Sequence, residues 1–464
     1  MKKITKLFLF FVIMVIGVTT VNAKEVFKLD WKTEEYVLEN TNTGISDYGV
    51  RNIEYKDGYL TTMMDSNNDW KTYINYYDVK GELITQSDIL SDSIILDLIV
   101  KNDVVYALVD RGSIYLLQLS DDLEDFDNMY RFPPAYTDDL KSMLYSEIPF
   151  FGINLLSVDD EGTAYVVTID YDMLVLSSEG ELSYESYNEE LLKKQFPELM
   201  ELEKYYLDDV YYYTLKMNDS HIVLGGIKPN ECLYTSDDCE YDSVGVITLQ
   251  DNTGKELWTK EYSEYKEFIN TILVGKYIVT IGIIDSEDQA PSHIVVIDQN
   301  GNIVQTIENE NSYYYLTATS RGIMVTNYSE EYNNGNDGIS YEDNVTISTE
   351  VYQLLYDINT TVNGKGTVEV VNNELPGTDV TFKVTPQEGY VLSEVRVTDA
   401  NGKVVTFTDY TFTMPSADVT IEVIFVEEVK NPITSSSFII IVAIGLAVSI
   451  SMLAYNQKKY KWLK

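Results

Sequence analysis

Short apolar segments alternate with polar turns along most of the chain, a pattern typical of successive β-strands. One motif recurs in which an apolar strand ends at Asp or Ser, a Gly follows shortly afterwards, and a second strand begins. The copies span residues 77–83, 176–182, 249–257 and 297–303. Glycine supplies the positive φ of a tight turn, and an Asp or Asn side chain bonds back to the backbone. Each copy therefore predicts a β-hairpin.

A second element, a turn followed by a buried strand, recurs about six times. It begins near residues 58, 103, 162, 220, 276 and 322. The spacing of about 45 to 60 residues is typical of propeller blades. We therefore predict an all-β chain with a β-propeller of about six blades over residues 24–357. We expect Tyr36 to Leu38 to pair near Val351 to Tyr356 and close the ring, because closure covers the sheet edges. A string of β-sandwich domains is the alternative.

This repeat pattern resembles the quinoprotein-like and WD40-like propellers. The resemblance is most evident at residues 251–258, Asp-Asn-Thr-Gly-Lys-Glu-Leu-Trp, but the other repeats lack the tryptophan, so it implies no quinone site. Two acidic, tyrosine-rich stretches, 121–151 and 184–213, interrupt the repeats and are expected to be insertions suited to binding. Within the second, residues 189–206 have the composition of a helix interrupted by Pro197.

A smaller β-rich domain is predicted over residues 358–426. Apolar residues alternate in 380–384 and in 419–425, as expected for half-buried strands. The segments 389–398, 401–402 and 412–420 resemble the divergent internalin-type B-repeat of bacterial surface proteins. That resemblance implies a stalk or spacer. An independent ligand-binding module is the alternative.

The N-terminus predicts export. Three lysines precede the unbroken apolar run 7–18, and Val21-Asn22-Ala23 has the small-residue pattern of a signal peptidase site. We predict a signal peptide at 1–23 and a mature chain that begins near Lys24. An uncleaved anchor is less favoured, because the apolar run is short for a spanning helix.

The C-terminus predicts a membrane anchor. A linker at 427–437 is followed by an apolar segment at 438–455, expected to be a transmembrane helix, and by a basic tail at 456–464. Lysines on the cytoplasmic side place the body of the chain at the extracellular face of the membrane or in the wall.

A motif in the linker resembles a Gram-positive cell-wall sorting signal. It reads Asn431-Pro432-Ile433-Thr434-Ser435. The resemblance implies that a sortase attacks the Thr434 carbonyl and that Ser435 leaves with the membrane segment. The motif differs from the commonest pattern at both ends, where Asn431 replaces Leu and Ser435 replaces Gly. A retained single-pass anchor is the alternative.

Charge and cysteine content narrow the function classes. The formal net charge is −42, which disfavours binding to nucleic acid, while 45% hydrophobic residues and 38 tyrosines predict a folded body. Cys232 and Cys239 are the only cysteines, and in an exported acidic loop they are expected to form a disulfide. Two free thiols are the alternative, and a metal site lacks further ligands nearby.

Candidate catalytic chemistry is sparse. His221 and His293 are the only histidines, and neither lies in a catalytic motif. A histidine-based triad is therefore disfavoured, and both histidines are expected to be structural. A carboxylate pair for glycoside cleavage cannot be located among 75 acidic residues. Loops 65–69 and 333–338 carry spaced oxygen ligands, but the first has Tyr76 where an EF-hand needs Glu, so solvated turns are preferred to calcium. No cofactor is predicted.

These patterns together predict a non-catalytic binding or adhesion protein at the cell surface. Tyrosine gives broad contact area at a low cost in conformational entropy, so the expected partner is a glycan or a protein. The alternatives are a wall-associated carbohydrate-active enzyme that uses a carboxylate pair, and an envelope scaffold.

Overall fold

The computed structural model divides the chain into two compact units, Met1–Leu355 and Tyr356–Lys464. It describes residues 24–33, 36–39, 51–65, 71–90, 93–136, 139–140, 154–168, 170–202, 210–229, 243–284, 292–308, 312–334 and 340–429. The predicted signal peptide, Cys232 and Cys239, the motif at 431–435, the apolar segment 438–455 and the basic tail lie outside these residues, as do most of the two loops considered for calcium. Within the described ranges, no helix combines the length and apolar character that a bilayer span requires.

Five antiparallel sheets of four strands follow one another in the first unit, each with its strands in chain order. The first sheet has β3 (Asn52–Tyr55), β4 (Gly58–Asp65), β5 (Lys71–Asp78) and β6 (Leu83–Ser87). The second has β7 (Ile94–Lys101), β8 (Val104–Asp110), β9 (Ile114–Leu119) and β10 (Phe126–Arg131). The third has β11 (Leu156–Val158), β12 (Ala164–Val167), β13 (Met173–Leu176) and β14 (Leu182–Glu185). The fourth has β15 (Tyr211–Met217), β16 (His221–Pro229), β17 (Ser243–Asp251) and β18 (Glu256–Tyr262). The fifth has β19 (Glu267–Val274), β20 (Tyr277–Ile283), β21 (Ser292–Ile297) and β22 (Ile303–Glu308).

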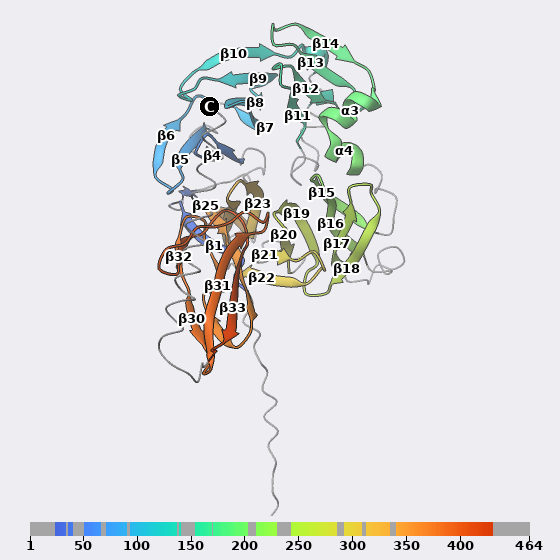
Figure 1. Ribbon diagram of the computed structural model, residues 1–464. Helices are drawn as coiled ribbons and strands as arrows, with labels where there is room; N and C mark the ends of the chain where they lie inside the picture. Colours follow the sequence, from blue (N-terminus) through green and yellow to red (C-terminus); the bar gives the residue numbers. More distant parts are fainter. Residues whose placement is uncertain are drawn as a thin grey trace, which may run out of the picture. The chain divides into compact units, whose positions relative to one another are not determined.

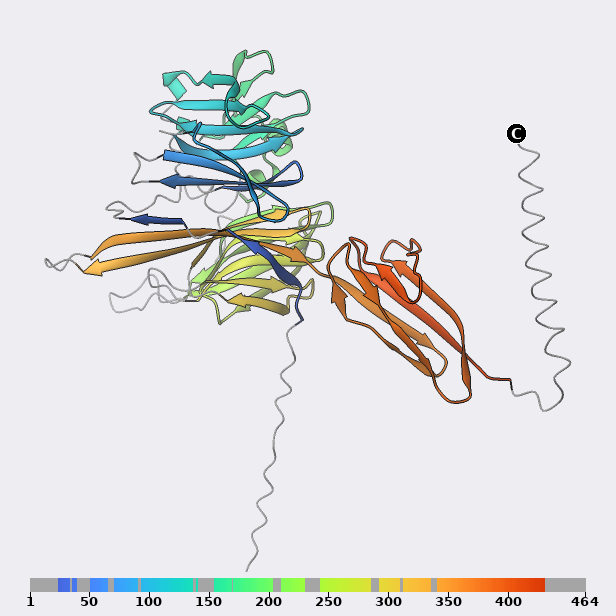
Figure 2. The ribbon, with the colours of Figure 1, turned by 90° about the vertical axis from the view of Figure 1, so that its left-hand side faces the viewer.

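The sixth sheet joins the two ends of this unit. It contains β23 (Ser312–Thr319), β24 (Gly322–Asn334) and β25 (Ser340–Leu354), and β1 (Phe27–Lys32) pairs with β25 as the fourth strand. A further strand, β2 (Tyr36–Glu39), pairs with β25 nearer the tip of the long β24–β25 hairpin, which Figure 2 shows reaching past the other strands.

The closing strand differs from the one predicted. Tyr36 to Leu38 were expected opposite Val351 to Tyr356, but β1 takes that place, with Phe27 opposite Leu354 and Lys32 opposite Glu350. Residues 36–39 pair with 344–347 instead. Burial of apolar side chains favours β1 in this place, because Phe27 is almost inaccessible to solvent and Trp31 packs against the rings of Tyr59 and Tyr77 in the first sheet.

The six sheets are the blades of a β-propeller. The first strand of each blade is here called its inner strand. Inner strands contact those of neighbouring blades, and at the junction of the third and fourth blades β15 contacts the short helix α4 (Pro197–Leu202). The contact of β23 with β3 joins the sixth blade to the first. Figure 1 shows the resulting ring. The all-β prediction is confirmed, and the described strands form six blades.

The recurring sequence elements correspond to fixed places in the blades. The turn-plus-strand element forms the second strand of every blade, and the Asp/Ser–Gly motif joins the third strand to the fourth in four of them. In one copy the Asp78 carboxylate accepts the amides of Lys80 and Glu82, and Gly81 has a φ of 80°. The second blade has Leu123 at a φ of 63° instead, and its side chain is buried.

The two stretches expected to be insertions belong in part to the blades. Both contain blade strands, β10 in the first and β14 and β15 in the second. Among their described residues, the other named elements are a 3₁₀ turn, η1 (Pro134–Tyr136), and the helices α3 (Glu189–Gln195) and α4. Helix α4 begins at Pro197, where the missing amide hydrogen removes no helical hydrogen bond.

The second unit is a small β domain with its own core. Its strands are β26 (Tyr356–Asn363), β27 (Gly366–Glu369), β28 (Asn373–Glu374), β29 (Asp379–Thr381), β30 (Lys383–Pro386), β31 (Tyr390–Asp399), β32 (Thr411–Thr413) and β33 (Val419–Glu427). The main sheet has the order β28-β26-β33-β31, in which β26 and β33 are parallel. The predicted alternation at 419–425 is confirmed, because Val419, Ile421, Val423 and Phe425 are all buried in the core.

Candidate binding site on the propeller axis

A cavity lies where the six blades meet. Its volume is about 320 Å³, at the lower end of the range for small-molecule sites. Five inner strands contribute side chains to its wall, and the residue shortly before β11 completes it. Representative residues are Asn52, Leu98, Asn154, Lys216, Asn270 and Tyr315. Because every blade contributes, this axial cavity exists only in the closed ring.

Local irregularities in the inner strands shape this wall. Pairing with the second strand of the blade is interrupted in β7, β15, β19 and β23. In β19 the interruption lies between Ile269 and Ile272, and Asn270 within it has a φ of 50° although the side chain is only 2% exposed. Bulges of this kind redirect side chains and are common beside functional sites.

Two side chains in the wall retain polar atoms without a partner. Asn52 is 3% exposed, and its Nδ2 donates to Thr326 Oγ1 at 2.6 Å while its Oδ1 has no hydrogen-bond partner. Thr317 Oγ1 is likewise buried and unpartnered. Buried polar atoms are normally satisfied by protein or water. Asn52 Oδ1 and Thr317 Oγ1 have almost no accessible surface, so they lie behind the surface of the wall and do not face the cavity.

Lys216 is the only charged residue in the wall as the structure describes it. Its Nζ lies 2.7 Å from Glu198 Oε2 on α4, and both side chains are 24% exposed, so the two charges offset one another. Neither Asp nor Glu is among the described lining residues. The ring of Tyr315 carries the Arg51 guanidinium at 5.5 Å from its centroid, which leaves an aromatic surface with one face already covered.

A buried carboxylate behind the wall connects the second and third blades. Asp97 Oδ2 accepts the amides of Leu155 at 2.8 Å and Leu156 at 3.0 Å, and Oδ1 accepts the amide of Leu98. Burial raises the pKa of Asp97, while the charge of Arg51 and these three amide donors oppose that rise. Since its oxygens are engaged by backbone donors, Asp97 has a structural role.

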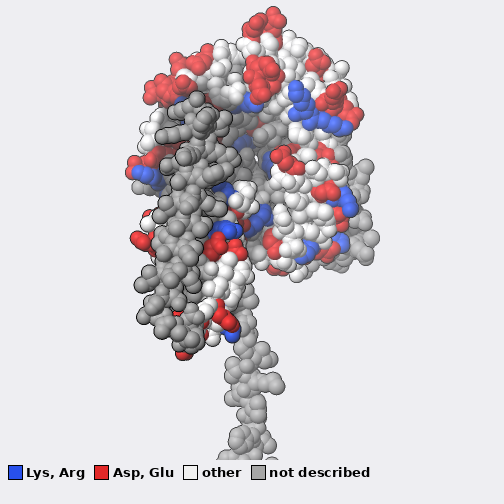
Figure 3. Space-filling model, in the orientation of Figure 1, with Lys and Arg blue, Asp and Glu red and all other residues white. Residues whose placement is uncertain are grey.

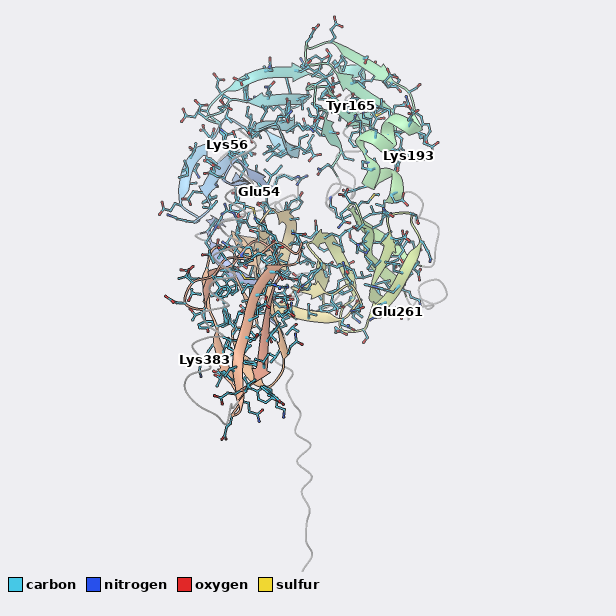
Figure 4. All side chains as sticks on the ribbon, in the orientation of Figure 1. Glu54, Lys56, Tyr165, Lys193, Glu261 and Lys383 are labelled. Carbon is cyan, nitrogen blue, oxygen red and sulfur yellow. The ribbon has the colours of Figure 1, made fainter. Side chains whose placement is uncertain are left out.

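Similar polar contacts connect other neighbouring blades. Glu54, labelled in Figure 4, lies on β3 of the first blade. Its carboxylate accepts a hydrogen bond from the backbone amide of Ser320 in the sixth blade at 2.7 Å. The amide of Thr271 donates to Thr214 Oγ1 at 3.2 Å, from the fifth blade to the fourth. These contacts fix the inner strands relative to one another, so the axial cavity is preorganised.

The outer surface is acidic, in agreement with the composition. Figure 3 shows Asp and Glu over the blades built from β7 to β14. The described part of the cavity wall, where Lys216 is paired with Glu198, thus differs from the acidic surface.

The two histidines considered from the sequence are not among the described residues that line the axial cavity. His221 begins β16, and His293 in β21 has its Nδ1 3.5 Å from the hydroxyl of Tyr265. Burial lowers the pKa of His293. Arg131 donates to Ser113 on the outer part of the second blade. In the described ranges, no group of three or more His, Cys, Asp or Glu is placed to hold a metal ion.

Sequence reasoning missed the residues of the axial cavity. A usable signal existed, because Asn270 and Thr271 interrupt the apolar run from Phe268 to Val274, and Thr317 follows Leu316 in the same way on β23. A polar residue inside a buried strand is a sign of a special environment. To place these polar residues on the axis of the propeller, the spatial order of the blades is also needed.

Residues 356–428 match the family model described as "Divergent InlB B-repeat domain", which supports the B-repeat resemblance for the second unit. No curated protein sequence matches the chain significantly. Solved structures with similar architecture include BamB from Moraxella catarrhalis, with 12% identity, a TM-score of 0.31, and coverage of 64% of this chain and 82% of that chain.

The Dos1 propeller has 9% identity, a TM-score of 0.28 and coverage of 68% and 82%. A member of the DUF4221 family from Bacteroides vulgatus has 8% identity, a TM-score of 0.30 and coverage of 71% and 99%. At these scores the likeness carries no argument about function, and the propeller assignment depends on the strand pairing above.

Proposed function

We propose that the chain is an exported, surface-anchored, non-catalytic binding protein that presents its propeller on a B-repeat spacer. Its ligand is a glycan or a protein at the cell surface. The observation that carries this proposal is the axial cavity, a preorganised space whose described wall offers amide, hydroxyl and apolar groups. Such a lining is typical of recognition by hydrogen bonding and packing.

The alternative of a carbohydrate-active enzyme is less well supported. Glycoside hydrolysis uses two carboxyl groups about 5 to 9.5 Å apart on either side of the scissile bond. The described wall of the axial cavity has none, and the buried carboxylate behind it, Asp97, is engaged by three amides. These features favour binding over turnover.

The anchoring part of the proposal depends on the two ends of the chain. Residues 1–23 direct export, 438–455 cross the membrane, and Thr434 is the carbonyl that a sortase transfers to the wall. Fractionation of cells that express the chain tests this. A wall-linked species in the wild type that is lost in Thr434→Ala supports the sorting step. A chain found in the cytosol with residues 1–23 still attached contradicts export.

The binding part is tested with the full chain in mild detergent. The protein is applied to a glycan array and to an array of surface proteins, and the same glycans are screened for hydrolysis. Saturable binding without product supports a binding protein. Product that accumulates catalytically contradicts it and favours the enzyme alternative.

A further inference from the structure

We propose that a pocket between the second and third blades is a docking site for an extended, basic segment of another protein, which inserts one apolar side chain into it. The described residues that line this pocket differ from those that line the axial cavity. The pocket therefore adds a second site to the proposed function and does not depend on the ligand of the axial cavity.

The pocket lies between one face of the second blade and two turns of the third. Side chains of β8, β9 and β10 form one wall, and the β11–β12 and β13–β14 turns form the other. Tyr106 and Gln118 are cross-strand neighbours, as are Gln118 and Asn128, so the three side chains lie side by side on one face of the sheet. Representative lining residues are Tyr106, Leu116, Gln118, Tyr130, Leu176 and Ser178.

The size of the pocket favours a single side chain as the occupant. Its volume is about 170 Å³, below the roughly 300 to 1,000 Å³ of sites for small organic ligands. A cavity of about 150 Å³ holds one benzene molecule, so this pocket has room for one Phe or Leu side chain. Leu116 and Leu176 supply apolar contact, and Met129, which is 57% exposed, extends that contact to the mouth. A side chain buried in a pocket of the partner often dominates the energy of a protein–protein contact.

A pair of side-chain amides at the pocket can recognise a peptide backbone. Asn128 Nδ2 donates a hydrogen bond to Gln118 Oε1 at 2.8 Å. Gln118 Nε2 then remains a donor and Asn128 Oδ1 an acceptor for a further molecule. Asn128 is exposed and Gln118 is half-buried, so both amides can be reached from solvent. A peptide unit carries one donor and one acceptor, so an extended segment beside the inserted side chain matches this pair.

The charge around the pocket favours a basic partner. Glu179 lines the pocket, and Glu161 and Glu181 lie exposed in the same two turns. The segment 154–185, which contains the third blade, has eight acidic residues and neither Lys nor Arg. Figure 3 shows this acidic surface. Lysines on either side of the inserted side chain complement it, whereas a second copy of this chain, with a net charge of −42, would be repelled.

The test measures peptide binding to the full chain in mild detergent by fluorescence anisotropy. The buffer contains about 150 mM salt, in which exposed charges more than about 8 Å apart are largely screened. The probes are labelled nine-residue peptides with two lysines at each end and a central Phe or Leu. In one matched set Gly replaces the central residue, and in another Glu replaces the lysines.

Two variants alter the pocket from exposed positions. Ser178→Trp fills the mouth from the β13–β14 turn, and Asn252→Trp, at the corresponding place in the β17–β18 turn, is its control. Glu179→Lys reverses a charge at the pocket, and Glu256→Lys, at the start of β18, is its control. Thermal unfolding compares the folding of each variant with that of the wild type. If Ser178→Trp does not fold, the comparison of Glu179→Lys with its control decides.

We expect a Lys-flanked Phe or Leu peptide to bind the wild type and both controls equally. Replacement of its central residue by Gly should weaken binding about tenfold or more, the effect of one apolar side chain no longer buried. Binding should be lost in Ser178→Trp and fall about fivefold in Glu179→Lys.

The docking site is overturned if none of these peptides binds, if the Gly-centred or Glu-flanked peptides bind as tightly, or if the folded pocket variants bind like the wild type. A glycan or protein captured on the arrays in the absence of peptide binding would overturn the docking site alone and leave the proposed function in place.

Discussion

The indole ring of Trp31 meets the phenol ring of Tyr59 edge to face, with centroids 5.7 Å apart and planes at 61°. Trp31 lies on β1 near the N-terminus, and Tyr59 lies on β4 in the first blade. A Cβ added to Gly81 would come within 2.6 Å of the same indole. Strand β1 therefore closes the ring through two contacts: it completes the sixth blade by pairing with β25, and it packs against the first blade through Trp31.

Loss of this indole should destabilise the propeller. We expect Trp31→Ala to lower the free energy of unfolding by roughly 3 kcal/mol, at the lower end for an aromatic side chain removed from a core, because Trp31 is partly exposed. Tyr187→Ala is the control, since the aromatic side chain of Tyr187 is 54% exposed. It should cost about 1 kcal/mol. Denaturant unfolding measures both, and equal losses would contradict the closing role of Trp31.

Two glycines in equivalent hairpins should respond differently to alanine. Gly81 and Gly254 both have a φ of 80°, so alanine costs about 1 to 2 kcal/mol of backbone strain at either site. At Gly254 the nearest atoms to an added Cβ are 4.0 Å away, whereas at Gly81 the added carbon meets Trp31. Gly81→Ala should therefore cost a further 1 to 3 kcal/mol or so. Thermal unfolding compares the pair, and a larger loss in Gly254→Ala would count against the Trp31 contact.

The carboxylate of Asp97 should be essential for stability. Asp97→Ala removes the acceptor for the amides of Leu155 and Leu156 and leaves Arg51 buried beside an uncharged site. Each buried amide left without its acceptor costs about 1 to 3 kcal/mol, so the total loss should be roughly 3 kcal/mol or more. Asp127→Ala on the exposed face of β10 is the control and should stay within about 0.5 kcal/mol of the wild type. A small loss in Asp97→Ala, measured by denaturant unfolding, would mean that the blades are held by packing alone.

His293 should make stability depend on pH in the mildly acidic range. Burial lowers its pKa below 6.5, and the carboxylate of Glu308 only partly opposes that shift. In this window the unfolded chain binds more protons than the folded one, so the stabilising contribution is fully present above pH 6.5 and is lost as pH falls towards the folded pKa.

The test compares His293→Gln with the wild type by thermal unfolding from pH 7.5 to 5. The wild type should lose more stability over this range than the variant. A parallel decline in both would show that groups other than His293 dominate the pH dependence. The half-buried carboxyl of Glu267 acts in the opposite sense, because burial raises its pKa and its protonation favours the folded state as pH falls.

Several features of the fold could be predicted from short stretches of sequence. The Asp–Gly hairpins depend on contacts within five residues, such as those of Asp298 with the amides of Asn300 and Asn302, so the sequence predicts them directly. The second strand of each blade follows from a turn and an apolar run. The prediction of the closing strand was wrong by several residues, because the pairing of β1 with β25 is accompanied by packing of Trp31 against Tyr59 of the first blade, a tertiary contact that the local sequence does not reveal.

The binding site shows the same division more sharply. The all-β class, the repeat period, the B-repeat domain and the excess of acidic groups could be predicted from the amino-acid sequence, because they follow from periodicity, turn chemistry and composition. That Asn52 and Thr317, more than 260 positions apart, line one cavity became clear from the folded chain alone. Ring closure brings the inner strands of all blades to a common axis, and a contact between residues so distant in the chain leaves no local trace in the sequence.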